Sequence, residues 1–233
     1  MLALLYDIHG NLPALEAVLA DARERGADRW LLGGDIAPFG AWPAETVARV
    51  RTLDDATWIR GNTERWLVDR HDLPDDQPMA AAVRACREAL GDELADELAA
   101  LPEAARVDEG TIAWHASPVS DMRSFLPEPA GDDDELLRGV TDRRLLFGHT
   151  HVQFRRAAHA GGQPVELVNP GSVGVPLDGD HRAAYGLLHP DGAIELRRVP
   201  YDHEVAAQAL RGRYGNEEWV AIVSGRIERA RLD

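Results

Sequence analysis

Two short motifs in the sequence place two metal-ligand side chains two residues apart. The first, DIH at residues 7–9, follows an apolar run at residues 2–5, and the second, HTH at residues 149–151, follows a glycine. Side chains two apart on an extended backbone point to the same side, so we expect each motif to present its two ligands together. Carboxylate and imidazole groups suit a borderline divalent metal ion. A turn-capping Asp7 beside a packed His9 would explain the first motif equally well, so the remaining residues decide.

Three further polar side chains stand where predicted strands end. Asp35, Asn62 and His115 each come shortly after an apolar run, and glycine precedes the first two. Short apolar runs before glycine turns are typical of buried strands in a parallel sheet, and open α/β sheets bind ligands at the carboxyl ends of their strands. A turn cap would account for Asp35 taken alone. The repeated pattern of strand, turn and polar residue nevertheless predicts that these side chains lie together at one edge of one sheet. The strands that precede them are expected at residues 30–32, 57–59 and 111–114.

The predicted ligands combine three oxygen donors with four imidazoles, which is too many for one metal ion. They fit two ions that share one carboxylate. Mixed nitrogen and oxygen ligation favours Mn, Fe, Co or Zn over Mg and Ca. Two such ions about 3.5–4 Å apart activate a water molecule and clamp a transferring phosphoryl group. The set is Asp7, His9, Asp35, Asn62, His115, His149 and His151.

These motifs, taken in order, resemble those of the calcineurin-like metallophosphoesterase family. The matching stretches are DIHGN, GGD, GN, the lone His115 and GHTH, and NPGSVG at residues 169–174 resembles the family's small bacterial phosphodiesterase branch. The resemblance implies an α/β (α+β) fold, a four-layer αββα sandwich of two mixed β-sheets in a single domain over residues 1–233.

The resemblance also implies a division of the ligands between two metal ions. The first would take Asp7, His9, Asp35 and His151, and the second Asp35, Asn62, His115 and His149. Asp35 would bridge the ions, and a metal-bridging hydroxide would be the nucleophile. The catalytic residues would be Asp7, Asp35, Asn62 and His115, acting through the metals. We expect two divalent transition-metal ions, with Mn preferred and Fe, Co, Ni or Zn as alternatives.

One residue departs from the family pattern in a way that bears on catalysis. Many members carry a histidine directly after the GN asparagine, and here Thr63 stands there. A threonine hydroxyl is a poor proton donor near neutral pH, and general acid catalysis contributes about 10²–10⁴-fold. We therefore expect esters with good leaving groups, or another donor. Glu64 and His71 are the nearest substitutes, but we expect both on helix surfaces, and Thr63 as a helix N-cap.

The remaining elements follow from periodicity and turn residues. Asn11 is expected to cap a helix, and the β-rich stretch 153–199 is expected to form an antiparallel meander or second sheet. A polar linker at 72–78 leads into a helical insertion at about 78–101, split at Gly91. A helical tail covers about 202–233. Tyr6 is a lesser departure, because the family more often has a small residue there.

Composition and charge restrict the function classes. The net charge of −15, with all 25 basic residues arginine, argues against broad attraction to nucleic acid. The sequence contains no run of 18 apolar residues, which a membrane span would need, and no basic stretch at its start. We therefore expect a cytoplasmic protein. The single Cys86 excludes an internal disulfide and is expected to be buried.

The favoured hypothesis is a dimetal-dependent phosphodiesterase that acts on small phosphodiesters, cyclic nucleotides being one candidate class, with phosphomonoesterase side activity. The first alternative is a nuclease on DNA or RNA, which the arginine-rich stretch 138–144 favours. The second is a non-catalytic binding protein on the same fold, which only Thr63 favours. The sequence does not indicate the oligomeric state.

Overall fold

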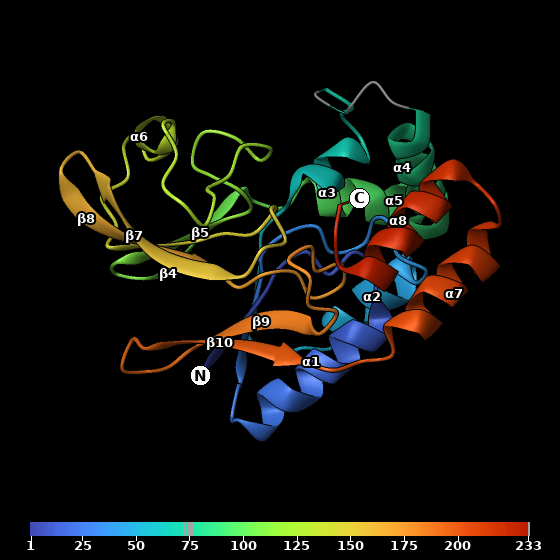
Figure 1. Ribbon diagram of the computed structural model, residues 1–233, viewed down its shortest axis with the longest axis horizontal. Coiled ribbons are helices and arrows are strands. Elements are labelled where there is room, and N and C mark those ends of the chain that lie inside the picture. The colour runs from blue at the N-terminus through green and yellow to red at the C-terminus, as the bar shows by residue number, and fades with distance from the viewer. Residues whose placement is uncertain (72, 74–76, 233) are drawn as a thin grey trace.

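The computed structural model describes residues 1–71, 73 and 77–232, and its strands form two five-stranded mixed sheets. The sheets lie one against the other, with helices on the outer side of the first (Figure 1). Sheet A has the order β10-β9-β1-β2-β3, and sheet B has the order β4-β5-β6-β8-β7. The predicted sandwich of two mixed sheets is therefore confirmed.

The strands are β1 (Leu2–Leu5), β2 (Arg29–Leu32), β3 (Ala56–Trp58), β4 (Ala104–Asp108), β5 (Thr111–Trp114), β6 (Arg144–Leu146), β7 (Phe154–Ala160), β8 (Gln163–Asn169), β9 (Ala183–Leu188) and β10 (Ile194–Val199). The helices are α1 (Leu12–Glu24), α2 (Pro43–Val50), α3 (Asn62–Trp66), α4 (Gln77–Leu90), α5 (Asp92–Ala99), α6 (Asp133–Leu136), α7 (His203–Tyr214) and α8 (Glu218–Arg229).

The central strand β1 is apolar throughout because both of its faces are buried. Leu2 and Leu4 pack between the two sheets, in a cluster that includes Leu146 of sheet B. Ala3 and Leu5 point the other way, into the core beneath the helices that cover sheet A. Alternating side chains therefore serve two cores, which explains why the run shows no polar alternation.

The prediction of a meander or second sheet over residues 153–199 was only partly right. β7 and β8 form an antiparallel hairpin in sheet B, where β8 also pairs in parallel with β6. β9 and β10 form another hairpin, but β9 pairs antiparallel with β1 in sheet A. The chain changes sheet after β8 because β1 has β2 on one side only, and its other edge must be covered. The half-exposed strand β4, at the edge of sheet B, was not predicted from the sequence.

The predicted helix cap at Asn11 and the predicted break at Gly91 are both confirmed. The Asn11 side-chain oxygen accepts a hydrogen bond from the Ala14 backbone (3.3 Å) at the start of α1. Gly91, at φ +78°, separates α4 from α5. The tail folds into α7 and α8, and α8 packs against both α7 and α4 (Figure 1). Most of the predicted linker at 72–78 lies outside the described residues, and the proposed domain limits stay a prediction.

Cys86 lies in α4 and its side chain is buried in the core, as expected, and burial raises the pKa of its thiol. In the part of the chain that the structure describes, no helix is long and apolar enough to cross a membrane.

Candidate metal centre

Each predicted ligand stands just beyond the carboxyl end of a strand, but the strands belong to both sheets. Asp7 and His9 follow β1, Asp35 follows β2, and Asn62 begins α3 after β3, all in sheet A. His115, however, follows β5 of sheet B, and the two histidines of GHTH follow β6 of the same sheet. The prediction of one sheet edge was therefore wrong. The centre lies where the carboxyl ends of two stacked sheets meet.

The structure brings these side chains into two groups that share one carboxylate. In each group the potential ligand atoms all lie within 4.8 Å of one another. The Asn62 side-chain oxygen is 3.0 Å from both His115 Nε2 and His149 Nδ1, next to the second group. The family resemblance implies the same division, with Asn62 added to the second group, and the role of these residues as metal ligands stays a prediction. The first group is Asp7, His9, Asp35 and His151, and the second is Asp35, His115 and His149.

The backbone at the ligands is not extended as the two-residue spacing suggested. Five of the eight non-glycine residues with positive φ in the described chain are predicted ligands. Such left-handed residues cost of order 1–3 kcal/mol each and cluster at functional sites. Tight turns, and not alternation along a strand, direct the paired side chains to one place. The φ values are 54° at Asp7, 50° at His9, 54° at Asp35, 67° at His149 and 58° at His151.

The loop NPGSVG holds the first of these turns. The Ser172 hydroxyl donates a hydrogen bond to the Asp7 backbone carbonyl (2.7 Å), and the Gly174 N–H donates to the same oxygen (3.0 Å). Asn169 donates from its side chain to the carbonyl of Gly148 (3.1 Å), just before the second turn. The loop therefore ties the turns of both sheets together without offering a ligand.

Glycine is needed near the ligands for space. A Cβ at Gly148 would lie 2.6 Å from the Asp7 carboxylate and 2.6 Å from the Tyr6 ring. A Cβ at Gly33 would lie 2.1–2.3 Å from three atoms of the same ring. The φ of Gly148 is not positive, so glycine is needed there for space and not for a left-handed backbone. Tyr6, the unusual residue at its position, fills the volume that these two glycines leave.

Backbone carbonyls set the tautomers of the histidines in the first group. His9 donates from Nδ1 to the Pro38 carbonyl (3.0 Å), and His151 donates from Nδ1 to the Val175 carbonyl (2.6 Å). In the neutral imidazoles the two Nε2 atoms therefore carry lone pairs, and they face each other at 3.0 Å. Two acceptors at this distance need a cation between them. Such carbonyl partners are typical of metal-binding histidines.

The charges of the first group fit the same conclusion. Burial lowers the pKa of His9 and of His151, so both imidazoles are neutral near pH 7. Burial, together with the nearby Asp35, raises the pKa of Asp7 well above its usual range. In this buried site, ionised Asp7 would therefore need a further positive charge beside it. A divalent ion with mixed nitrogen and oxygen ligands supplies it.

The second group has the same character. The His115 Nδ1 donates to the Gly33 carbonyl (2.9 Å), which directs Nε2 toward the shared carboxylate. Burial would lower the pKa of His115, but the carboxylates of Asp35 and Asp7 outweigh it and raise the pKa. Burial would likewise raise the pKa of Asp35, but the neighbouring histidines hold it at about 2. Asp35 is therefore the ionised carboxylate common to both groups.

Glu64 has a structural role that sequence reasoning missed. It is fully buried, and its carboxylate accepts hydrogen bonds from the backbone N–H groups of Asp35 (2.7 Å), Ile36 (2.7 Å) and Gly61 (2.9 Å). The predicted surface position was wrong. A glutamate three residues after the N-cap Gly61 has the spacing of a capping box, and this signal could have located it.

Thr63 also binds the shared carboxylate. Its hydroxyl and its backbone N–H donate hydrogen bonds to the same Asp35 oxygen, at 2.9 and 3.0 Å. Thr63 is not the N-cap of α3, because Gly61 occupies that position and Asn62 is already helical. Thr63 therefore holds Asp35, and its only hydroxyl proton is already donated to that carboxylate.

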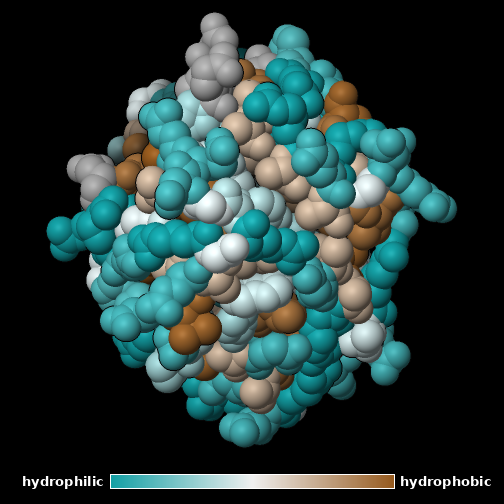
Figure 2. Space-filling view, turned by 90° about the vertical axis from the view of Figure 1, so that its right-hand side faces the viewer, coloured by the Kyte–Doolittle hydropathy of each residue, from teal (hydrophilic) through white to brown (hydrophobic). Residues whose placement is uncertain are grey.

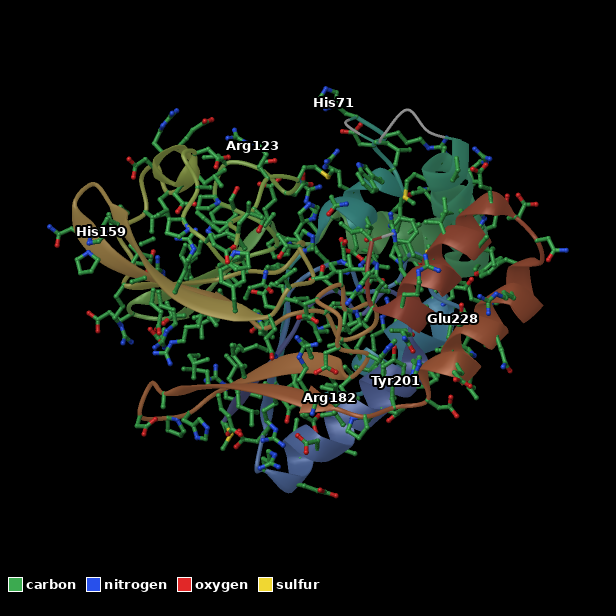
Figure 3. All side chains as sticks on the ribbon, in the orientation of Figure 1. His71, Arg123, His159, Arg182, Tyr201 and Glu228 are labelled. Carbon is green, nitrogen blue, oxygen red and sulfur yellow. The ribbon has the colours of Figure 1, made fainter. Side chains whose placement is uncertain are left out.

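A pocket of about 190 Å³ opens over the two groups. Apart from ligands and Thr63, its lining is mainly apolar, and α8 contributes Arg226 to it. The other histidines lie elsewhere. His71, the second suggested proton donor, is exposed at the outer edge of the molecule (Figure 3). His159 lies toward the end of the β7–β8 hairpin (Figure 3). His181 and His203 stack on each other at 4.4 Å.

Comparison with known proteins shows the family. Residues 1–192 match the family model described as calcineurin-like phosphoesterase superfamily domain. An uncharacterized protein of Methanocaldococcus jannaschii is 31% identical over 226 residues, which cover 90% of this chain and 91% of that protein. The chain therefore belongs to the calcineurin-like phosphoesterase superfamily, and the resemblance inferred from its motifs is confirmed.

Solved structures agree with this assignment. A metallophosphoesterase from Sphaerobacter thermophilus is 27% identical, with a TM-score of 0.79 and 98% of both chains covered. A hypothetical protein from Pyrococcus horikoshii OT3 is 23% identical, with a TM-score of 0.80 and coverage of 96% of this chain and 98% of that one. The second likeness shows the fold alone. Family and site together define a metallophosphoesterase with candidate ligands for divalent metal ions.

Proposed function

We propose that the protein is a dimetal-dependent phosphodiesterase that hydrolyses small phosphodiesters, with phosphomonoesterase activity as a side reaction. The observation that supports it best is the pair of ligand groups that share Asp35. When bound, two divalent transition-metal ions supply an activated hydroxide and neutralise charge on the phosphoryl oxygens. We propose Mn as the native metal, with Fe, Co, Ni or Zn as alternatives, because the donors mix imidazole nitrogen with carboxylate and amide oxygen.

The roles of the chain's own residues follow from their contacts. Asp7, His9, Asp35 and His151 would hold one ion, and Asp35, Asn62, His115 and His149 the other. Thr63 and Glu64 fix Asp35 from two sides, through its carboxylate and through its backbone N–H. These contacts hold the Asp35 carboxylate in one orientation, so it would be preorganised to bind both ions.

The pocket offers few side chains that could protonate the leaving group. The residue directly after Asn62 is Thr63 and not a histidine, and the Thr63 hydroxyl proton is already donated to Asp35. Glu64 accepts three N–H groups in the protein interior, so it is not placed to reach a substrate. We therefore expect a strong preference for esters whose alcohol leaves without a proton, such as aryl esters.

We propose a small ester and not a nucleic acid as the substrate. The net charge of −15 works against attraction to a polyanionic strand, and the pocket over the ligands holds only about 190 Å³. A nuclease stays the second candidate only for short ends that enter this pocket. A cytoplasmic location stays a prediction.

The test begins with protein stripped of metal. We expect hydrolysis of bis-p-nitrophenyl phosphate after addition of Mn, faster than that of p-nitrophenyl phosphate, and none without metal. Asp35→Asn should lower kcat/KM by at least about 10³-fold, because several kcal/mol of charge stabilisation disappear. Asp21→Asn, at a carboxylate outside the site, is the matched control and should retain activity. Turnover of neither ester with any of the five metals would rule out the enzyme and favour a binding protein.

A further inference from the structure

The pocket over the ligand groups has an unusual composition for a site that handles phosphate. Its walls away from the ligands are largely apolar and include Phe39, Trp66, Leu177 and Val223. Phe39 stands next to the ligands, since its ring centroid lies 5.5 Å from that of His9. A free phosphate or a highly charged ester would gain nothing from such walls. Apolar walls instead stabilise an apolar ligand group by removing it from water.

Arg226 brings the one guanidinium among the described residues that line this pocket. It lies on α8 three residues after Val223, which lines the pocket too, so one helix face presents both side chains. Arg226 lines the same pocket as the candidate ligands His9 and His151, so its positive charge faces the space above the ligand groups. Residue 226 lies beyond residues 1–192, which match the family model.

We propose that Arg226 binds a phosphoryl oxygen of the substrate while the apolar walls hold one aromatic or apolar ester group. The substrate class would then be small phosphate esters that carry one such group. This inference rests on the proposed function. An arginine matches phosphoryl oxygens geometrically, with paired N–H donors in one plane. The C-terminal helix α8, and not the motifs that carry the candidate metal ligands, would then select the substrate.

The surface around the helices favours a small ligand over a protein partner. On the face that carries α4, α7 and α8, hydrophobic side chains show as small separate patches among hydrophilic ones (Figure 2). A stable protein interface needs a larger continuous contact area than such patches provide. A pocket of about 190 Å³ is of the order that one phosphate with one ring would fill.

The experiment measures binding of phosphonates, which the enzyme cannot hydrolyse at the phosphorus–carbon bond. Isothermal titration of Mn-loaded protein with phenylphosphonate and with methylphosphonate separates the contribution of the ring from that of the charged group. We expect phenylphosphonate to bind about 10-fold more tightly, because its ring leaves water. Leaving-group chemistry does not enter this comparison.

Variants then assign the two contributions. Arg226→Gln should weaken both phosphonates by about 10- to 100-fold, the loss expected for hydrogen bonds to a charged group. The affinity of Arg226→Lys for both phosphonates should lie between the affinities of the parent and of Arg226→Gln, because lysine keeps the charge and loses the paired donors. Arg229→Gln is the matched control, because Arg229 lies one turn further along the same helix but is exposed and does not line the pocket, and this variant should bind as the parent does. Metal content, measured by elemental analysis, should be unchanged in all three.

Phe39→Asn tests the apolar wall alone. Asparagine tolerates the positive φ of 84° at this position better than most side chains do. The preference for phenylphosphonate over methylphosphonate should fall several-fold, with methylphosphonate binding unchanged. Circular dichroism of each variant confirms folding.

Two results would overturn the inference and leave the proposed function intact. One is parent-like binding of both phosphonates by Arg226→Gln in an enzyme that hydrolyses bis-p-nitrophenyl phosphate. The other is equal affinity of the parent protein for the two phosphonates. Absence of hydrolysis by the parent with every metal would instead contradict the proposed function.

Discussion

Two clusters of charged side chains in this protein follow opposite rules. At the carboxyl ends of the strands, the ligand cluster (the two groups around Asp35) is buried, and two imidazole lone pairs face each other at 3.0 Å. At the other cluster, Asp21 of α1 accepts hydrogen bonds from Tyr185 (2.5 Å) and from Arg197 (2.8 Å) on the neighbouring strands. We call the second the Asp21 cluster.

The difference lies in whether donors and acceptors balance. In the Asp21 cluster each charged group meets an opposite charge, so the contacts are complete within the protein. In the ligand cluster acceptors meet acceptors, and burial makes the imbalance expensive. Unpaired hydrogen-bond acceptors gathered in one buried place, on residues with left-handed backbone, are the arrangement expected of a cation-binding site. The stability of the two clusters should therefore respond differently to mutation, metal and pH.

The largest expected effect concerns space around the ligands. Gly33→Ala should lower the free energy of unfolding by about 3 kcal/mol, because its Cβ would overlap the buried Tyr6 ring. Gly212→Ala, in α7 with open space at its Cβ, is the control and should stabilise by up to about 1 kcal/mol. Urea unfolding measures both. In a Tyr6→Ala background the cost of Gly33→Ala should shrink, and an equal cost there would contradict the packing account.

The stabilisation of the fold by metal binding should be the second largest effect. Adding Mn to metal-free protein at 100 times its dissociation constant should stabilise the fold by about 2.7 kcal/mol, because the ion binds only the folded ligand cluster. Thermal unfolding with and without Mn measures this. The gain should be mostly absent in Asp35→Asn and fully present in Asp21→Asn. An equal gain in Asp35→Asn would mean that the ion binds elsewhere.

Glu64→Gln should destabilise the protein by about 2 kcal/mol. The carboxylate accepts three buried N–H groups, whereas an amide offers one oxygen and brings two donors with no acceptor to meet. Glu45→Gln removes a charge that pairs with Arg213 at the surface and should change stability by less than about 0.5 kcal/mol. Similar costs for the two substitutions, measured by chemical denaturation, would show that Glu64 does not organise the turn at Asp35.

The smallest effect is expected in the Asp21 cluster. Asp21→Asn should lower stability by about 1 kcal/mol at pH 6, as befits a partly exposed ion pair. Arg197 and Tyr185, against the opposing effect of burial, lower the pKa of Asp21 to about 2 in the folded protein, below its ordinary 3.8. The stabilisation is therefore present above pH 4 and is lost as the pH falls toward 2. A difference between variant and parent that stays constant from pH 6 to pH 2.5 would contradict this assignment.

Local patterns sufficed for much of the fold and for the choice of seven candidate ligands, whose role as ligands stays a prediction. Apolar runs, glycine turns and caps such as Asn11 act within a few residues, so spacing along the chain reveals them. The same locality explains the misplacement of Glu64. Its surface or buried position depends on the turn at Asp35, which is almost 30 residues away in sequence and close in space.

Other features depend on contacts that no local pattern encodes. That β9 pairs with β1, although about 180 residues separate them, follows from the need to cover an open sheet edge. That His115 and His149 come from a second sheet follows from the stacking of two layers around one apolar core. Residue types and order along the chain thus specify the chemistry of the ligands. Only the packing of the two sheets places those ligands around a shared carboxylate, and only the packing of α8 against α4 brings Arg226 to the pocket above them.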